Sequence, residues 1–321
     1  NNIPSPIKYS FIRDGLNNAI KNKNIFLIKY LLDQKAKSDY ALIEAVKTND
    51  INVVDLVLKY LDPIFINQKT NEGTSLIIST QNNNLNIVKR LLSIPGIDAS
   101  IRNLRNHTAI NIAVLKQNIE IFETIIEFYG SNIVTETSQL NESIRIILET
   151  STKKEDYPIE KAITILRRII KIDNIDYNFS YKNDTILTFA CNNNCQDIVK
   201  YLLSNNKVDV NLTDCKEGNT ALIKSIKSGN YEISKLLIEH PTTDINIQNY
   251  KSETALTISV IKEAEEIINY LIKSPKFESE RSRLDYAFYI SSPKISKQLI
   301  SCPNLDVNYI DNDTSSWGSS K

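Results

Sequence analysis

Glycine is scarce in this sequence, which contains seven glycines among 321 residues, well below the average usage of about 7%. Turns that need a left-handed backbone therefore cannot depend on glycine throughout the chain. Asparagine is abundant where turns are expected, and it is the residue other than glycine that best tolerates this conformation. The sequence therefore predicts tight turns built largely on asparagine.

Histidine is also rare, with only His107 and His240 in the chain. Metal sites need clustered cysteine and histidine ligands at short spacings, and Cys191 and Cys195 have no histidine nearby. We interpret Cys191 as a small, buried core residue. A Cys–His nucleophilic pair would have to join distant parts of the sequence, and the GxGxxG, P-loop and HExxH motifs are missing. We expect no enzyme activity, no metal site and no cofactor.

The chain has no net charge and no long apolar run. Its 38 basic and 38 acidic residues balance, which argues against a nucleic-acid-binding protein that depends on overall charge but leaves local patches open. No apolar run approaches the length of a membrane span. The four cysteines indicate a reduced, cytoplasmic protein rather than a disulfide scaffold. We recognise no signal peptide, although a chain that starts without methionine could have lost one.

What the sequence does contain is a repeated unit, clearest from Val208 to Pro241. It begins with a segment that we expect to be extended, Val208 to Asn211, followed by a turn at Asp214 to Gly218. Thr220 is placed to cap a short helix, and a break at Ser228 to Asn230 separates this helix from a second amphipathic segment. Neither helix is long enough to be stable alone in water, so the unit needs neighbours.

Similar units recur along the chain. An aliphatic residue of the first helix is followed 15 residues later by an aliphatic residue of the second, and successive units lie 34 or 35 residues apart in the regular parts. The interval is shorter before Leu42 and before Leu284, where we expect the projecting turn to be missing or shortened. The first-helix positions are Leu16, Leu42, Leu76, Ile110, Leu187, Leu222, Leu256 and Leu284, and the second-helix positions are Leu31, Val57, Leu91, Ile125, Leu202, Leu237, Leu271 and Leu299.

This pattern resembles the ankyrin repeat, whose period of about 33 residues is a turn plus two helices. The resemblance covers roughly Phe11 to Asn308. The usual Thr-Pro-Leu-His is altered, because Ala, Ser or Ile replaces the proline and Ile, Asn or Thr replaces the histidine. The residues that carry the resemblance are the segments 208–211, 244–246 and 305–308 and the helix starts 218–222 and 253–256. It implies an all-α, ankyrin-type α-solenoid of about nine helix pairs with short projecting β-turns.

The expected domain organisation has three parts. Residues 1–10, with two prolines, are expected to be an extended lead-in, residues 11–308 the ankyrin-repeat domain, and residues 309–321 a C-terminal tail. The module at about 133–172 is irregular, with two amphipathic helices on either side of a polar insertion at Thr150 to Tyr157. Such insertions go to surface loops. The end of the repeat region shows no clear cap, so either the tail folds back or the natural protein continues.

The resemblance implies a non-catalytic scaffold that binds protein partners, and we expect a monomer that binds no nucleic acid. The rival interpretation is a targeting module of a larger enzyme or effector whose catalytic part lies outside this chain. In ankyrin stacks the partner usually lies along the concave face, which is built from the projecting turns and the inner helices. That face is therefore the place to look for a site.

Aligned positions on the concave face are mostly basic. Nine basic residues are set against three acidic ones, so the sequence predicts a basic stripe that attracts an acidic protein segment. The alternative is an ordinary solvated, lysine-rich surface. The nine are Lys21, Lys47, Arg105, Lys116, Lys182, Lys216, Lys227, Lys251 and Lys262, the three are Asp184, Glu217 and Glu253, and Leu104, His107, Tyr181 and Tyr250 lie among them. The predicted partner-binding residues are Arg105, His107, Lys116, Tyr181, Lys182, Lys216, Lys227, Tyr250, Lys251 and Lys262.

Overall fold

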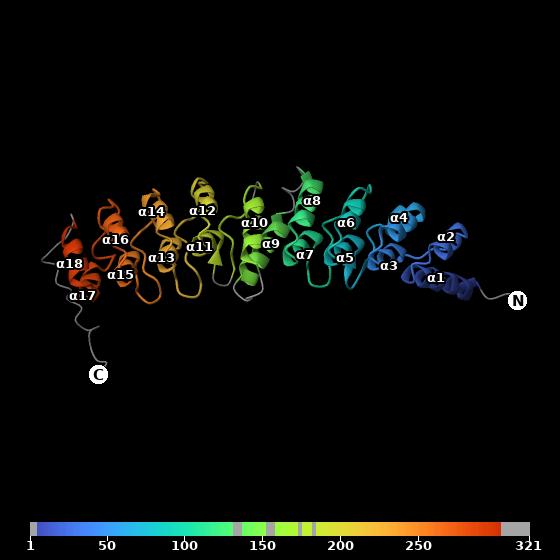
Figure 1. The fold of residues 1–321 in the computed structure, drawn as a ribbon, viewed down its shortest axis with the longest axis horizontal. Helices are drawn as coiled ribbons and strands as arrows, with labels where there is room; N and C mark the ends of the chain where they lie inside the picture. Colours follow the sequence, from blue (N-terminus) through green and yellow to red (C-terminus); the bar gives the residue numbers. More distant parts are fainter. Residues whose placement is uncertain (1–4, 131–136, 152–157, 173–174, 182–183, 303–321) are drawn as a thin grey trace, which may run out of the picture. The chain divides into compact units, whose positions relative to one another are not determined.

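The structure is a computed structural model that describes residues 5–130, 137–151, 158–172, 175–181 and 184–302. Within these residues the chain divides into two compact units, unit 1 (residues 1–175) and unit 2 (residues 176–321). Each unit is a series of helix pairs, and in each pair a first helix is followed by a second helix after a short connection (Figure 1).

Unit 1 has five helix pairs in its described residues. The first helices are α1 (Ser5–Lys21), α3 (Ala41–Lys47), α5 (Ser75–Gln81), α7 (Ala109–Leu115) and α9 (Thr137–Ser151). The second helices are α2 (Ile25–Asp33), α4 (Ile51–Tyr60), α6 (Leu85–Leu92), α8 (Ile119–Tyr129) and α10 (Ile159–Ile169). A 3-10 helix, η1 (Pro63–Phe65), precedes the strands β1 (Lys69–Thr70) and β2 (Gly73–Thr74), which pair antiparallel.

Unit 2 has four helix pairs in its described residues. Its first helices are α11 (Ile186–Asn192), α13 (Ala221–Lys227), α15 (Ala255–Ile261) and α17 (Leu284–Ile290). Its second helices are α12 (Gln196–Leu203), α14 (Tyr231–Glu239), α16 (Glu265–Ile272) and α18 (Pro293–Ile300). The strands β3 (Ser180–Tyr181) and β4 (Asp184–Thr185) form a second antiparallel pair, and a single bridge joins Thr213 to Thr220.

Within each unit the helices form two layers. Each first helix packs against the next first helix, and each second helix packs against the next second helix. The predicted all-α stack of about nine helix pairs with short β-turns is therefore confirmed. The connections before α3 and α17, where the intervals are shorter, contain no strand pair.

The core lies between the two layers. All eight first-helix positions of the repeat pattern are buried, from Leu16 to Leu284, and so are seven of the eight second-helix positions. Leu31 of α2 is the exception because it is half-buried. The irregular module follows the same rule, since Leu140, Ile144 and Leu166 are buried between α9 and α10 and their neighbours. The repeat pattern thus located the core correctly.

Threonines cap the first helices at regular positions. The side chain of Thr220 accepts a hydrogen bond from the backbone N–H of Ile223 at 3.3 Å, as predicted. Thr74, Thr185 and Thr254 do the same for α5, α11 and α15. Each cap satisfies a backbone donor that the first turn of a helix leaves open.

The residue between the two helices of a pair has a left-handed backbone in seven pairs. It is asparagine in three of them, Asn49, Asn83 and Asn194, and glycine only at Gly229. The remaining three positions are Lys23, Gln117 and Glu263. The prediction that asparagine supports the turns is confirmed at three positions, and other residues with side chains take this conformation as well.

Two expectations about extended segments are wrong. The segment from Val208 to Asn211 contains a turn rather than a strand, because Asp209 accepts a hydrogen bond from the N–H of Asn211 at 2.9 Å and bends the chain there. The lead-in is helical from Ser5 onward, as part of α1. Pro6 does not prevent this, because a proline in the first turn loses no intrahelical hydrogen bond. Residues 1–4, the insertion at 152–157 and the tail at 309–321 lie outside the described residues.

Candidate protein-binding face

The turn tips and the C-terminal ends of the first helices share one surface. In unit 2, the Nζ of Lys227 at the end of α13 lies 3.2 Å from Glu217 and 2.9 Å from Glu253, which belong to two successive turns. In unit 1, the Nζ of Lys47 at the end of α3 reaches Glu72, in the turn between β1 and β2, at 3.1 Å. We call this surface of each unit its tip face, defined by residues 72, 104–107 and 115–116 in unit 1 and by 181, 184, 214–219, 227, 249–253 and 261–262 in unit 2.

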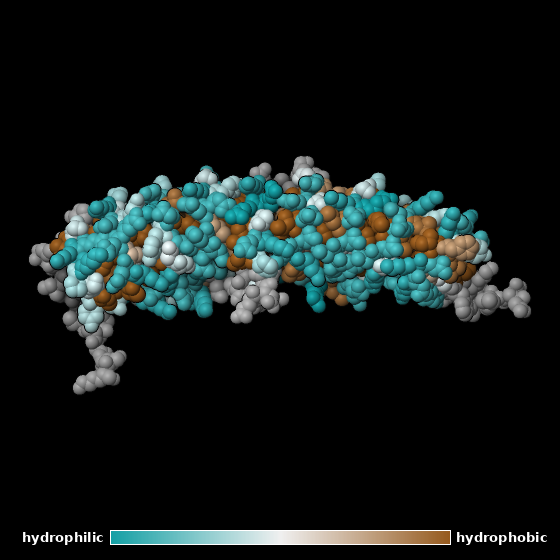
Figure 2. Space-filling model, viewed as in Figure 1, coloured by the Kyte–Doolittle hydropathy of each residue, from teal (hydrophilic) through white to brown (hydrophobic). Residues whose placement is uncertain are grey.

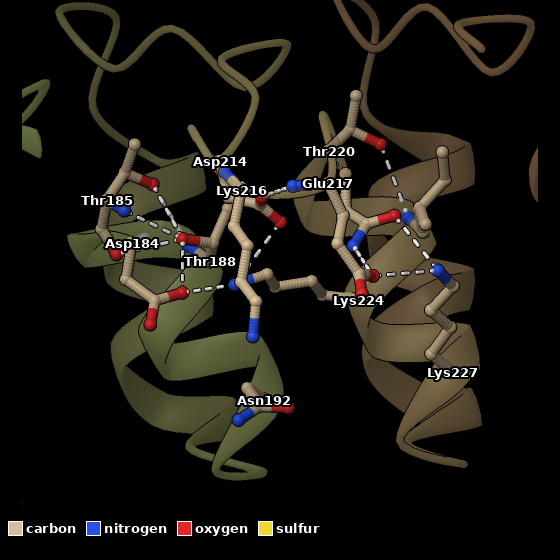
Figure 3. A network of polar contacts seen from close by, with 12 residues as sticks. Asp184, Thr185, Thr188, Asn192, Asp214, Lys216, Glu217, Thr220, Lys224 and Lys227 are labelled. Atoms are coloured by element: carbon tan, nitrogen blue, oxygen red, sulfur yellow. Dashed lines mark hydrogen bonds and ion pairs between the residues drawn. The ribbon is translucent and has the colours of Figure 1, made fainter. Parts of the chain in front are cut away.

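A buried ionic network anchors the tip face in unit 2 (Figure 3). Lys224 of α13 contacts the carboxylate of Asp184, and its Nζ lies 3.5 Å from Asp214. Asp214 is buried and also accepts hydrogen bonds from the backbone N–H groups of Lys216 and Glu217. Thr188 donates to Asp184 at 3.1 Å. Lys224 therefore joins two successive turns, and Asp184 is not available to a partner.

Glu217 lies in the same turn as Asp214 and binds side chains of this turn, of α13 and of the next turn. It accepts a hydrogen bond from Asn219 and contacts Lys227, and these interactions lower the pKa of Glu217 to about 2. Lys251 approaches the other carboxylate oxygen at 3.6 Å. Burial disfavours the charge on Lys227, but its hydrogen bonds to Glu253 and Glu217 outweigh burial and raise its pKa. The charges of Lys227 and Lys251 are thus largely offset within the protein.

His107 points toward the irregular module of unit 1. Its Nε2 lies 3.8 Å from Glu142 of α9, while Nδ1 is buried without a hydrogen-bond partner. Burial lowers the pKa of His107 despite the nearby carboxylate. Arg145 explains why Glu142 does not reverse the shift, because the guanidinium holds both oxygens of that carboxylate. Little of His107 is accessible, so its role is in packing the turn against α9.

The predicted excess of basic residues shrinks once the ion pairs are known. Lys21 lies 3.6 Å from Glu44, and Lys47, Lys227 and Lys251 are paired as described. Lys182 lies outside the described residues. In the part of the chain that the structure covers, the basic tip-face residues with no ion pair are Arg105, Lys116, Lys216 and Lys262.

Large apolar side chains accompany most of these four cations. Leu104 next to Arg105 is 76% exposed, and Ile261 next to Lys262 is 59% exposed. Leu115 next to Lys116 is also exposed. Tyr250, beside Lys251, is 69% exposed although its ring lies against Gly218, where an added Cβ would come within 2.7 Å of the ring. Tyr181 is half-buried in β3. The tip face therefore carries adjacent apolar and basic residues in both units.

The sequence analysis missed Lys224, Asp214 and Glu142. Lys224 stands three residues before Lys227 on α13, and this spacing on one helix could have shown that the two side chains lie near each other. The carboxylates that they bind lie outside α13, in the preceding turn of the same repeat (Asp214, Glu217) and in the turns of the neighbouring repeats (Asp184, Glu253). The pairing of the lysines was therefore not predictable from the helix alone.

A groove of about 680 Å³ lies elsewhere in unit 2, at the C-terminal ends of α14 and α16. Its walls include Ile238, Tyr270 and Pro275. Lys276, also in the wall, donates a hydrogen bond to the backbone carbonyl of His240 at 2.8 Å. Burial lowers the pKa of Lys276. The lysine thus satisfies carbonyl groups at the end of α14, and the groove belongs to the junction between two repeats.

Cysteines and metal ligands add little to the site. Cys191 is fully buried, which confirms its interpretation as a core residue, and burial raises the pKa of its thiol. Cys195 and Cys302 are also buried, whereas Cys215 is exposed. Within the described residues, His, Cys, Asp and Glu form no group of three that could hold a metal ion. In the same part of the chain, no helix is both long and apolar enough to span a membrane.

Stacked helix pairs with projecting turns define a repeat protein, and comparison with known families identifies the repeat. A family model for ankyrin repeats in three copies matches residues 16–103, 42–137 and 159–249. The chain therefore belongs to the ankyrin-repeat family. Proteins of this family are built as scaffolds for protein–protein interaction.

Curated relatives are similar over part of the chain. An I-Kappa-B like protein of Microplitis demolitor bracovirus is 29% identical over 117 residues, which is 35% of this chain and 69% of the relative. A putative ankyrin repeat protein of Acanthamoeba polyphaga mimivirus is 30% identical over 117 residues, 36% of this chain and 15% of the relative. The Notch-regulated ankyrin repeat-containing protein A of Danio rerio is 35% identical over 77 residues, 22% of this chain and 68% of the relative.

Among solved structures, the chain is similar to the ankyrin repeat domain of Bcl-3, described as a unique member of the IkappaB protein family. The match covers 89% of this chain and 97% of that chain, with 15% sequence identity and a TM-score of 0.39.

Proposed function

We propose that this protein is a non-catalytic scaffold that binds an acidic, apolar-containing segment of a partner protein on its tip face. The observation that carries the proposal is the difference between paired and unpaired helix-end lysines. Lys47 and Lys227 each bind a carboxylate that stands 25 or 26 residues later, in a following turn. Lys116 and Lys262 follow α7 and α15 directly, one position beyond the equivalent place, which Leu115 and Ile261 occupy, and they have no such partner in the described residues.

The elements that lie 26 residues after these two lysines also differ from the turns that contain Glu72 and Glu253. The position 26 residues after Lys116 is Glu142, which lies in α9 and is held by Arg145. The position 26 residues after Lys262 is Phe288, which lies in α17 because the preceding turn is short. A partner carboxylate would give these lysines the interaction that a turn glutamate gives Lys47 and Lys227. Leu115 and Ile261, directly beside them, would contact apolar side chains of the same segment.

The proposed contacts form one set in each unit. Unit 1 contributes Leu104, Arg105, Leu115 and Lys116, and unit 2 contributes Lys216, Tyr250, Ile261 and Lys262. Arg105 and Tyr250 are the expected anchors, because arginine and aromatic residues dominate the cost of truncation at interfaces. Tyr181 and Lys251 are further proposed contacts on the tip face of unit 2, and the proposed contact Lys182 lies outside the described residues.

Affinity capture with mass spectrometry tests this function. We expect the wild-type chain to retain proteins with an exposed acidic segment, and a Lys116→Glu/Lys262→Glu variant to bind them about tenfold more weakly, which corresponds to about 1.4 kcal/mol. The matched control is Lys89→Glu/Lys200→Glu, which reverses two exposed lysines on the second helices α6 and α12. Equal capture by both variants, or captured proteins without an acidic segment, would contradict the proposal.

A further inference from the structure

The second helix of the first pair, α2, is apolar on nearly all sides. Its sequence IFLIKYLLD contains only Lys29 and Asp33 as charged residues. A helix with apolar residues all around is normally buried, but only Ile28 and Leu32 of α2 are. Phe26 is 82% exposed and Tyr30 is 54% exposed. In Figure 2, brown atoms gather over α2 near the N-terminal end of unit 1.

The second helix α6 of the same unit does not share this feature. In α6, which has the sequence LNIVKRLL, the buried residues are Ile87, Val88, Leu91 and Leu92, and Asn86 and Lys89 are exposed. That division between an apolar and a polar side is what a helix at the surface of a stack requires. The exposed apolar side of α2 therefore needs an explanation beyond packing within the repeat.

Positive charge surrounds the exposed side of α2. Lys23 precedes the helix, Lys29 lies on it, and Lys35 and Lys37 follow it. All four side chains are exposed, and none has an ion pair within the described residues. Asp33 is the one carboxylate of α2, and it accepts a hydrogen bond from the hydroxyl of Tyr60 at 2.7 Å. The chain as a whole is neutral, so this excess of lysine is local to α2.

We infer that the exposed side of α2, formed by Ile25, Phe26, Leu27 and Tyr30, docks an acidic amphipathic helix of a partner protein. Phe26 and Tyr30 are four residues apart and lie one above the other on the helix. A partner helix with apolar residues at i, i+3, i+4 and i+7 presents an apolar stripe that can pack along Phe26 and Tyr30. Aspartate or glutamate beside that stripe would form ion pairs with Lys23 and Lys29. These ion pairs would fix the orientation of the partner helix on α2 and raise its rate of association.

The lysines around α2 favour an acidic partner helix over a second copy of the chain. Two α2 faces brought together would place lysines against lysines, which disfavours self-association. A lipid surface is also less suited, because of these apolar side chains only Phe26 and Tyr30 are more than half exposed. The side chains of a protein helix can also contact Ile25 and Leu27, which are 44% and 38% exposed. This surface is separate from the tip face, so the inference does not rest on the proposed function.

The test uses a fluorescent 20-residue peptide designed as a helix, with leucine and phenylalanine on one stripe and glutamate beside it, and the full chain as receptor. Fluorescence anisotropy should show binding that weakens with added salt. The variant Phe26→Ser/Tyr30→Ser should bind at least tenfold more weakly, and Lys29→Glu should lower both the affinity and its dependence on salt. Circular dichroism checks that each variant is folded, which is expected because the altered side chains are exposed.

Two matched variants serve as controls. Ile64→Ser removes an exposed apolar residue of unit 1 outside α2, and Lys89→Glu reverses the lysine of α6 that corresponds to Lys29. Neither should change peptide binding. The inference is overturned if the peptide does not bind, or if Ile64→Ser weakens binding as much as Phe26→Ser/Tyr30→Ser. It is also overturned if Phe26→Ser/Tyr30→Ser abolishes dimers in sedimentation velocity, or binding to phosphatidylserine vesicles, without affecting the peptide.

Discussion

Asparagine side chains connect successive turns in both units. The amide of Asn211 donates to the carbonyl of Thr242 and accepts from the N–H of Asp244, both at 2.8 Å. Asn67, Asn178 and Asn246 make the same pair of contacts with the turn that follows each of them. At Asn178, Asn211 and Asn246 the aspartate two residues earlier bends the chain, and the asparagine then bridges to the next repeat. This explains the recurring Asp-x-Asn of the sequence, for which an extended segment was expected.

Replacing Asn246 by alanine should destabilise unit 2. The side chain is buried and bonds the carbonyl of Lys276, the N–H of Glu278 and the hydroxyl of Ser282. Loss of these bonds leaves buried groups unsatisfied, so we expect the free energy of unfolding to fall by about 2 kcal/mol. Urea denaturation measures the change. Asn86→Ala, on the exposed side of α6, is the control and should have almost no effect. If Asn246→Ala leaves the free energy of unfolding unchanged, the hydrogen bonds from asparagine to the next turn do not stabilise the stack.

His107 should make the stability of unit 1 depend on pH. Burial lowers its pKa in the folded protein below the ordinary value of 6.5, so the unfolded chain binds the proton more readily. The contribution of neutral His107 is therefore complete above pH 6.5 and is lost as the pH falls through this value toward the folded pKa. Urea midpoints measured from about pH 8 to about pH 5.5 should fall less for His107→Gln than for the wild type. A larger fall in the variant would contradict the assignment.

At the scale of elements, the helices follow directly from local sequence patterns. Apolar periodicity located the helix pairs, and Thr220 marked the start of α13, because these signals lie within a few residues of the structure that they specify. The charges of the tip face could not be predicted in the same way. Lys47 and Lys227 pair with glutamates that stand 25 or 26 positions later, in the following turns. Lys116 and Lys262 have no such ion pair in the described residues, and nothing within their own helices shows this difference.

The connection between α15 and α16 offers an element that can be stabilised. Glu263 has a left-handed backbone with φ of 52°, a conformation that costs a residue with a side chain about 1 kcal/mol or more. Glycine adopts this conformation freely, although it loses more backbone entropy on folding than glutamate does. After this entropic cost is subtracted, Glu263→Gly should raise the free energy of unfolding by about 1 kcal/mol. Calorimetry should show a melting temperature higher by about 2 °C.

Gly229 provides the reverse experiment. It occupies the same position between α13 and α14 with φ of 74°, and an added Cβ would meet nothing within 4 Å. Gly229→Ala therefore changes only the backbone preference, and it should lower the free energy of unfolding by about 1 kcal/mol. If both substitutions shift the melting temperature in the same direction, the backbone conformation is not what limits stability at these connections.

On the scale of the whole chain, the repeat signal predicted the architecture because each repeat contacts only its neighbours. Five helix pairs in unit 1 and four in unit 2 are built on one pattern. The candidate site was predicted less completely. Leu104, Arg105, Lys116 and Tyr250 are exposed on the expected surface. The charges of Lys227 and Lys251 are instead offset by Glu217 and Glu253, which stand in two successive turns.

Hydrogen–deuterium exchange with and without the captured partner tests the central claim most directly, because it locates the bound surface without any substitution. The account predicts slower exchange at residues 104–107 and 115–117 in unit 1 and at 250–253 and 261–263 in unit 2. Exchange in the second helices α6, α12 and α14 should not change. Protection confined to these second helices, with the tip face unaffected, would contradict the assignment of the tip face as the protein-binding surface.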